Sequence, residues 1–390
     1  MPRLPPSLFR RARSISPHVA TLLPACRDLD TARRELRWIR EHACSVLSRS
    51  ATLRARPPTA AHSSRSPRRR KPRGEQLGHR PGTGADGRGA SRGKQQGEKR
   101  AELDRLVARL CRERGAGKPL QYVLGSQPFG PLEIACGPGV LIPRAETEAW
   151  TARVAAVVGE ACAAGDALTV VDLCTGTGCV ALLLHALLQR PGLRIRGVDV
   201  APRAVALARR NLAAYAGAAA TPPDVAFARA DVFDPAAGLA ALLPLPPPAA
   251  PDAWPRVDLL VANPPYIAPR DFARDTARAV RNWEPRLALV PPPVAGETWA
   301  GRAIYARLLD IAERTRARFA LFEVGGAAQA HGVVRLARRR GDVEIEIWRD
   351  WPDAQPQDGE AQAVDVDGVA LPVRGSGHIR SVFIRRDGAR

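Results

Sequence analysis

The sequence predicts an α/β fold: a Rossmann-like, doubly wound sheet with an antiparallel last strand, plus a small helical N-terminal domain and a linking β-hairpin. Three observations predict it. From Leu168 onward, short β-branched runs alternate with stretches of helical periodicity, as in a parallel sheet covered by helices on both faces. Glycine and proline turns between residues 118 and 148 are typical of a hairpin. Further upstream, apolar residues recur at helical spacing.

The first 27 residues have the composition of a targeting segment. They contain five arginines, no acidic residue and no long apolar run. We therefore predict that residues 1–27 are a mitochondrial transit peptide, and RRARSIS resembles a matrix-processing site. The alternative is a disordered basic tail with no targeting role. No stretch approaches ~18 apolar residues, so we expect a soluble protein of the mitochondrial matrix with no membrane partner.

Residues 28–118 are predicted to be a helical region interrupted by a basic insert. Apolar residues recur at helical spacing over residues 29–43 and again over 101–114. Between these helices, residues 45–100 are rich in Arg, Ser, Pro and Gly, and such a composition buries too little apolar surface to offset the entropy of ordering. We predict that this insert is disordered. Three interpretations are open: a solvated segment, a nucleic-acid-binding arm, or unspliced sequence retained in the gene product.

The positive charge is concentrated at one end of the chain. The formal net charge is +20, and residues 1–100 hold 24 basic and 7 acidic residues, which leaves only +3 for the remainder. A large nucleic-acid footprint needs a basic face on the folded domain, so no stable nucleic-acid binding is expected there. The seven cysteines form no C-x-x-C pair, so neither a metal site nor a disulfide framework is expected.

The elements of the α/β part follow from their periodicity. The expected strands are residues 167–173, 194–200, 224–231, 257–265, 318–324, 343–350 and 378–386, and the expected helices are residues 180–189, 202–216, 304–317 and 329–340. The last strand follows an Asp/Gly-rich loop and is expected to pair antiparallel with the edge of the sheet. Ligands of open sheets bind at the carboxyl ends of the strands, so candidate site residues are sought there.

The first strand leads into a glycine-containing turn that is predicted to bind a cofactor. Glycines between a strand and a helix allow a ligand to approach the backbone closely, and the helix amino terminus favours an anion. There is no P-loop and no complete G-x-G-x-x-G, so several classes of nucleotide ligand fit. The candidate residues of this turn are Asp172, Cys174, Thr175, Gly176, Thr177 and Gly178.

Two acids end the next two strands. Asp199 is placed to accept hydrogen bonds from ribose hydroxyls, and Asp231 to receive an exocyclic adenine amine, with Val232 against the ring. Either acid alone could be a helix cap or turn residue. Taken in order, and followed by Asn263 after the fourth strand, the set resembles the class I S-adenosylmethionine-dependent methyltransferases. The resemblance implies that fold and S-adenosylmethionine as cofactor, with Asn263 also in contact with it.

The motif Asn263-Pro264-Pro265-Tyr266 is predicted to be catalytic. A planar nitrogen delocalises its lone pair and is a weak nucleophile. The Asn263 side-chain oxygen and the Pro264 carbonyl can accept both of its N–H bonds, the prolines hold the turn rigid, and Tyr266 offers a flat face to the planar group. Glutamine N5, adenine N6 and guanine N2 all fit this motif.

Residues 118–148, KPLQYVLGSQPFGPLEIACGPGVLIPRAETE, narrow the choice. They resemble the hinge and hairpin of the HemK/PrmC family, the release-factor glutamine N5-methyltransferases, and DLCTGTG, NPPY, Glu284-Pro285 and Glu323-Val-Gly325 resemble further markers of that family. The resemblance implies a hinge and hairpin over residues 119–148, a catalytic domain over 149–390, and N-terminal helices that dock the substrate. The implied substrate is the glutamine of the Gly-Gly-Gln loop of a peptide-chain release factor.

With the predicted leader, the resemblance points to the fungal mitochondrial branch and a mitochondrial release factor, and we expect a monomer. The departures are Ala145 in place of a proline and GETWAG over 296–301 in place of a D-G-L motif; both bear on substrate docking. Arg144, Glu146 and Glu148 either line the cofactor pocket or form surface ion pairs. Two other functions are open: methylation of an exocyclic amine of a nucleic-acid base, and a noncatalytic adaptor that keeps the fold.

Overall fold

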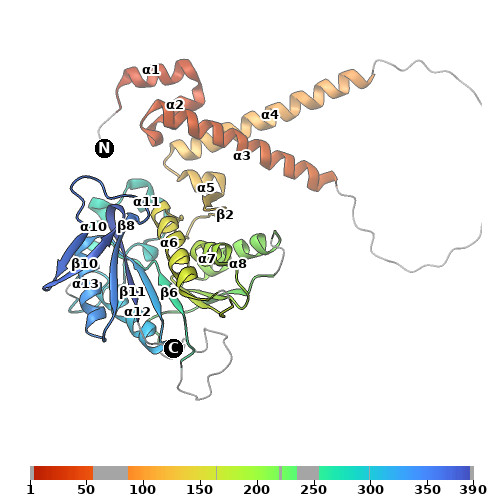
Figure 1. Ribbon diagram of the computed structural model, residues 1–390. Coiled ribbons are helices and arrows are strands. Elements are labelled where there is room, and N and C mark those ends of the chain that lie inside the picture. The colour runs from red at the N-terminus through yellow and green to blue at the C-terminus, as the bar shows by residue number, and fades with distance from the viewer. Residues whose placement is uncertain are drawn as a thin grey trace, which may run out of the picture. The chain divides into compact units, whose positions relative to one another are not determined.

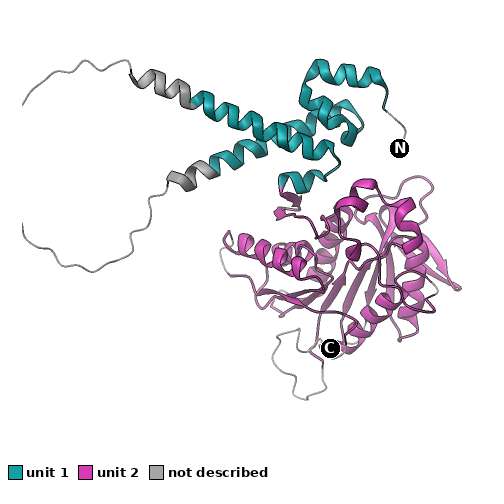
Figure 2. Cartoon of the chain, turned by 180° about the vertical axis from the view of Figure 1, so that it is seen from behind, with its two compact units in different colours: residues 1–124 teal, residues 125–390 magenta. Residues whose placement is uncertain are grey.

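The chain folds into two compact units, residues 1–124 and 125–390 (Figure 2). The computed structural model describes residues 4–55, 87–163, 165–218, 222–234, 254–297 and 299–386. The boundary between the units falls inside the segment 119–148 that was predicted to link the domains. Each unit has its own hydrophobic core.

The first unit is helical. Its helices are α1 (Pro6–Ile15), α2 (Pro17–Cys26), α3 (Leu29–Ala55), α4 (Gly87–Gly115) and α5 (Leu120–Leu124). Their apolar faces form one buried cluster, in which Leu22 and Ile39 are fully buried. A two-pronged ion pair joins α3 to α4, because Arg114 donates to Glu35 from Nε at 2.7 Å and from Nη2 at 2.9 Å. Both side chains are nearly buried, so the pair holds the two helices in one register.

The N-terminal residues that were predicted to be a leader are helical. Residues 6–26 form α1 and α2, and Ala12, Val19 and Leu23 lie in the same buried cluster as α3 and α4. The physical reason is that apolar residues recur at helical spacing between the arginines of α1, and the arginines face outward.

The predicted insert over residues 45–100 is also corrected at both ends. Helix α3 continues to Ala55 and α4 begins at Gly87, so residues 45–55 and 87–100 are helical instead of disordered. Neither stretch contains a proline, and each extends a helix that is already anchored in the core, which is far less costly than nucleating a new one. Residues 56–86 of the predicted insert lie outside the described residues.

The second unit is built on a nine-stranded sheet (Figure 1). Its strands are β3 (Thr169–Leu173), β4 (Arg194–Asp199), β5 (Val225–Arg229), β6 (Leu259–Ala262), β7 (Phe319–Glu323), β8 (Glu344–Trp351), β9 (Ala363–Val366), β10 (Val369–Arg374) and β11 (Ser376–Arg385), in the order β5-β4-β3-β6-β7-β11-β8-β10-β9. The first five in that order pair in parallel. The predicted doubly wound, mostly parallel sheet is confirmed.

Strand β11 is antiparallel, as predicted, but it does not lie at the edge. It pairs with β7 on one side and β8 on the other. Its run Val382-Phe383-Ile384 is buried throughout, which suits a strand covered on both faces and paired on both sides. The edge is instead the β9–β10 hairpin, with Val369 opposite Val366, which the periodicity did not predict.

Helices cover both faces of the sheet (Figure 1). Helices α6 (Ala145–Ala161), α7 (Cys179–Leu188) and α8 (Pro202–Ala216) pack on one face, and α12 (Arg302–Arg314) and α13 (Ala327–Arg338) on the other. Successive residues of a strand point to opposite faces. In β3, accordingly, Val170 joins the core under α7 and Val171 the core under α12.

Two shorter groups of elements complete the unit. The predicted hairpin is present as β1 (Ser126–Phe129) and β2 (Leu132–Ala135), paired antiparallel. The hinge and hairpin were predicted to extend to residue 148. The hairpin ends at Ala135, and helix α6 already begins at Ala145. After β6 come α10 (Pro269–Asp275), α11 (Arg278–Trp283) and the 3-10 turn η1 (Arg286–Ala288). No helix among the described residues is long and apolar enough to cross a membrane.

Candidate active site

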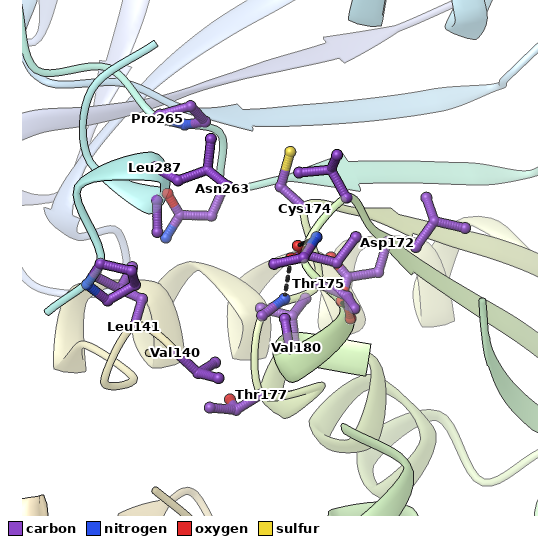
Figure 3. A pocket seen from close by; sticks show the side chains of 18 of the residues that line it. Val140, Leu141, Asp172, Cys174, Thr175, Thr177, Val180, Asn263, Pro265 and Leu287 are labelled. Carbon is purple, nitrogen blue, oxygen red and sulfur yellow. Dashed lines mark hydrogen bonds between the residues drawn. The ribbon is translucent and has the colours of Figure 1, made fainter. Parts of the chain in front are cut away.

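A cavity of about 290 Å³ lies at the carboxyl ends of β3, β4 and β6 (Figure 3). Parallel strands end at the same edge of the sheet, so residues far apart in the sequence meet there. The predicted site residues on its wall are Asp172, Cys174, Thr175, Gly176, Thr177, Asp199, Asp231, Val232, Asn263 and Pro265. Among the described residues, no group of three or more His, Cys, Asp and Glu is arranged to hold a metal ion.

Three predicted site residues are not on the cavity wall. Gly178 has φ +78° and begins α7, and a side chain there would point at Phe227. Pro264, which lies between Asn263 and Pro265 in the chain, is buried, and its carbonyl accepts no hydrogen bond from the described residues. The Tyr266 hydroxyl points inward and donates to Glu323 Oε1 at 3.2 Å. Their positions make all three supports of the wall.

The turn after β3 is held from inside the protein. Its backbone enters the left-handed region at Cys174 (φ 62°) as well as at its two glycines. Thr175 bridges the turn: its N–H donates to the Val198 carbonyl at 3.0 Å, and its hydroxyl donates to Asp172 Oδ2 at 2.5 Å. Asp172 is 2% exposed. The turn therefore presents backbone to the cavity while its anchoring carboxylate stays buried.

Burial raises the pKa of the Asp172 carboxyl to about 7, and the hydrogen bonds from Thr175 and the Ala181 N–H only partly oppose it. A carboxyl whose pKa is raised on folding favours the folded state at low pH, and that contribution is lost as the pH rises through the folded pKa. The charged form therefore destabilises the fold above pH 7.

We expect Asp172→Asn to remove this penalty. Its melting temperature, measured without cofactor, should rise relative to the unmodified chain as the pH is increased from 5 to 8, because only the unmodified chain acquires a buried charge over that range. A difference between the two melting temperatures that is the same at both pH values would contradict the assigned cause.

Asp199 orders the same turn from the second strand. Its Oδ2 accepts from the Gly176 N–H and its Oδ1 from the Ala201 N–H, both at 2.9 Å. A carboxylate has about four lone-pair sites, so each oxygen keeps one for a ligand. Burial raises the pKa of Asp199, opposed by these two backbone donors. Asp231 is exposed at the cavity rim, and its Oδ1 accepts from the Phe233 N–H at 2.9 Å.

Another wall of the cavity consists of residues 139–144 and of Pro285, Leu287, Ala288 and Pro292. Of these, Arg144 was considered for the pocket from the sequence, and residues 285–292 were not. Buried Glu284 joins its two halves, because it accepts from the Ile142 N–H at 3.0 Å and from Arg144 Nη2 at 2.7 Å. Arg144 therefore both lines the cavity and forms an ion pair, while Glu146 and Glu148 do not line it. Both motifs were recognised in the sequence, but nothing there indicated that Glu284 pairs with Ile142 and Arg144.

A hydrogen-bonded network lies behind Asn263. Its Nδ2 donates to Thr147 Oγ1 at 3.2 Å, and that hydroxyl donates to Glu323 Oε2 at 2.6 Å. Trp150 Nε1 donates to the same carboxylate oxygen at 2.8 Å. Burial raises the pKa of Glu323, and the bonds from Thr147 and Trp150 oppose the shift.

Gln329 secures the same loop from the other side. Its Nε2 donates to the Tyr266 carbonyl at 2.8 Å and to the Ala300 carbonyl at 2.9 Å, and its Oε1 accepts from the Gly325 N–H. Neither Gln329 nor Thr147 was singled out from the sequence, because nothing local marks their partners.

The two departures from the family pattern lie away from the cavity wall. Ala145 is the exposed first residue of α6. In the 296–301 segment, Glu297 accepts from the Ala303 N–H at 2.7 Å and Trp299 packs on Tyr305, so this segment anchors the start of α12. Thr298 lies outside the described residues.

Comparison with known proteins decides the family. No family model matches the chain. The mitochondrial MRF1 N(5)-glutamine methyltransferase MTQ1 of Saccharomyces cerevisiae is 30% identical over 296 residues, which cover 74% of this chain and 68% of that protein. The probable MRF1 mitochondrial N(5)-glutamine methyltransferase of Schizosaccharomyces pombe is 34% identical over 237 residues, 60% of this chain and 72% of that protein. The chain belongs to the release factor glutamine methyltransferases.

Bacterial members are similar as well: the release factor glutamine methyltransferase of Chlorobaculum tepidum is 35% identical over 192 residues, 49% of this chain and 58% of that protein. Among solved structures, the N-terminal domain of human METTL16 in complex with SAH is 14% identical with a TM-score of 0.40, over 70% of this chain and 82% of that one. The predicted family and enzyme class are confirmed, and the glutamine methyltransferase prediction is supported over the nucleic-acid alternative.

Proposed function

We propose that this methyltransferase transfers a methyl group from S-adenosylmethionine to the side-chain nitrogen, N5, of the glutamine in the Gly-Gly-Gln loop of a mitochondrial peptide-chain release factor, in the mitochondrial matrix. The relatives from both yeasts are named for MRF1 and for mitochondria. The observation that carries the proposal is a pair of acceptors on adjacent residues: Asn263, which lies on the cavity wall, and Pro264, which is buried next to it in the chain. Asn263 Oδ1 and the Pro264 carbonyl have no hydrogen-bond donor among the described residues.

A primary amide has two N–H bonds, and two acceptors are what it needs. We assign Asn263 Oδ1 and the Pro264 carbonyl to these two bonds. They favour the positive charge that develops on the nitrogen, and because they are fixed before the reaction, no reorganisation opposes them. Pro264 and Pro265 hold the backbone that carries both acceptors. The nitrogen releases its proton only after the methyl group is added, so we assign no general base.

The residues on the opposite wall fit the cofactor. Asp199 keeps one free lone pair on each oxygen, which suits the two ribose hydroxyls, and the turn from Cys174 to Gly178 offers backbone to the amino-acid end. Asp231 and Val232 lie at the rim for the adenine ring. When bound, S-adenosylmethionine supplies a methyl group on a positively charged sulfur. The chain's own residues hold both reactants and exclude water.

We assign the helical unit to docking of the release factor and expect the enzyme to act as a monomer without binding nucleic acid. The charge of +3 over residues 101–390 supports the expectation that nucleic acid is not bound, because such binding needs a basic face on the folded part. Residues 1–27 stay proposed as the transit peptide, and its cleavage on import would remove α1 and α2 from the helical unit.

The test is a methyl-transfer assay. The purified chain is incubated with labelled S-adenosylmethionine and, separately, with a mitochondrial release factor, the same factor with the Gly-Gly-Gln glutamine changed to alanine, and total RNA. Label is expected only in the unmodified release factor. Label in RNA but not in the release factor, or equal label in the alanine variant, would overturn the proposal.

A further inference from the structure

The two ends of an asparagine amide have nearly the same shape, but only the oxygen can accept a hydrogen bond. The role proposed for Asn263 therefore depends on which end faces the cavity, and a partner must distinguish them. Asn263 lies on the cavity wall beside Pro265 (Figure 3). Its hydrogen-bond partner is Thr147, a residue of α6 that also lines the cavity and is 3% exposed.

A hydroxyl can either donate or accept, so Thr147 alone does not settle the direction. Glu323 settles it. Its Oε2 lies 2.6 Å from Thr147 Oγ1 and 2.8 Å from Trp150 Nε1, and an indole nitrogen can only donate. The Tyr266 hydroxyl donates to the other carboxylate oxygen, Oε1, so every hydrogen bond to Glu323 runs toward the carboxyl group. This set of donors suits a carboxylate, which can only accept, and the Thr147 hydroxyl then gives its single proton to Glu323.

With its proton committed, Thr147 can only accept from Asn263. The end of the amide that faces Thr147 is therefore Nδ2, and Oδ1 is turned away from it. We propose that Thr147 and Glu323 are positioning residues that fix the direction of the Asn263 amide, so that Oδ1 and not Nδ2 meets the substrate amide. This inference rests on the proposed function of Asn263. It also explains why a carboxylate 2% exposed is kept behind the motif.

The first test is Thr147→Val, which keeps the shape of the side chain and removes the acceptor. The Asn263 amide is then free to rotate by 180°, so we expect kcat to fall by about tenfold or more. This loss is smaller than the one expected when a whole preorganised side chain is removed. The affinity for S-adenosylmethionine and the melting temperature should change little. Thr147→Ser keeps the hydroxyl and should restore most of kcat.

Thr151→Val is the matched control. Thr151 lies one turn further along α6, is fully buried, and donates to the Thr147 carbonyl at 2.6 Å. Thr151→Val is the same substitution and also removes a buried hydroxyl, but among the described residues the Thr151 side chain forms no hydrogen bond with Glu323 or Asn263. Its kcat should stay close to that of the unmodified chain.

Glu323→Leu tests the direction itself. It removes the acceptor of the Thr147 hydroxyl, which is then free to donate to Asn263 and turn Nδ2 toward the cavity. We expect kcat to fall at least tenfold, and we expect this effect to disappear in a Thr147→Val background, because no hydroxyl remains to pass on the reversal. This variant also decides the matter if Thr147→Val does not fold.

Steady-state kcat and KM with a release factor, together with equilibrium binding of S-adenosylmethionine, give the result. A kcat for Thr147→Val equal to that of Thr151→Val, or full activity of Glu323→Leu, would overturn this inference while leaving the proposed function intact. Absence of release-factor methylation by the unmodified chain would instead overturn the proposed function.

Discussion

Asn263→Ala is expected to lower kcat for release-factor methylation by at least ~10²-fold, because a preorganised acceptor for the developing charge contributes about this much to the rate. The affinity for S-adenosylmethionine should change by much less. Most of the cavity wall belongs to other residues, and the removed side chain is assigned to the substrate amide. Rapid-mixing single-turnover assays with saturating release factor, and calorimetric titration with S-adenosylmethionine, separate the two effects.

Asn282→Ala is the control for that experiment. Asn282 lies on α11, is exposed and is not on the cavity wall. The same substitution there should leave both kcat and cofactor affinity unchanged. Near-normal turnover of Asn263→Ala, or a loss that lies mainly in cofactor affinity, would refute the role assigned to Asn263.

Gly178→Ala is expected to reduce the free energy of unfolding of the second unit by about 2–5 kcal/mol. The left-handed backbone at φ +78° disfavours a side chain by roughly 1–2 kcal/mol. In addition, the new Cβ would lie 2.7 Å from Phe227 Cζ and 3.1 Å from Ala208 Cβ, and overpacking of this kind costs about 1–3 kcal/mol. Denaturation with urea, followed by the fluorescence of the buried tryptophans, measures the change.

Gly296→Ala isolates the packing contribution. Gly296 has nearly the same backbone angle, φ +75°, but a Cβ there meets nothing within 4 Å. It should therefore show the backbone cost alone and be less destabilising than Gly178→Ala by about 1–3 kcal/mol. Equal losses in the two variants would show that Phe227 and Ala208 move aside without cost.

The parts of the site that the sequence predicted are those that depend on strand order. Asp172, Asp199, Asp231 and Asn263 each follow a buried strand, and parallel strands bring their carboxyl ends to one edge. Local patterns were sufficient there, because chain order and spatial order are linked through the sheet. The turn around Gly176 was predictable for the same reason, since a strand-to-helix turn has few backbone solutions.

The parts that were missed depend on long-range pairs. Glu284 lies 142 residues from Ile142, and Glu323 lies 176 residues from Thr147, so no local pattern shows that they meet. Helices α1 and α2 were missed for a different reason: composition counts arginines but not the face on which they lie. In α1 the arginines are exposed while Ala12 is buried.

The position of β11 has a consequence for biosynthesis. Glu323 ends β7, which pairs with β6 on one side and β11 on the other, with Ser381 opposite Glu323. The ribosome makes β11 after β8, yet β11 fills the gap between β7 and β8. Until it arrives, two strand edges stay open, and open edges invite pairing with other chains. Ribosomes stalled before residue 376 should therefore display a chain that aggregates and cannot methylate.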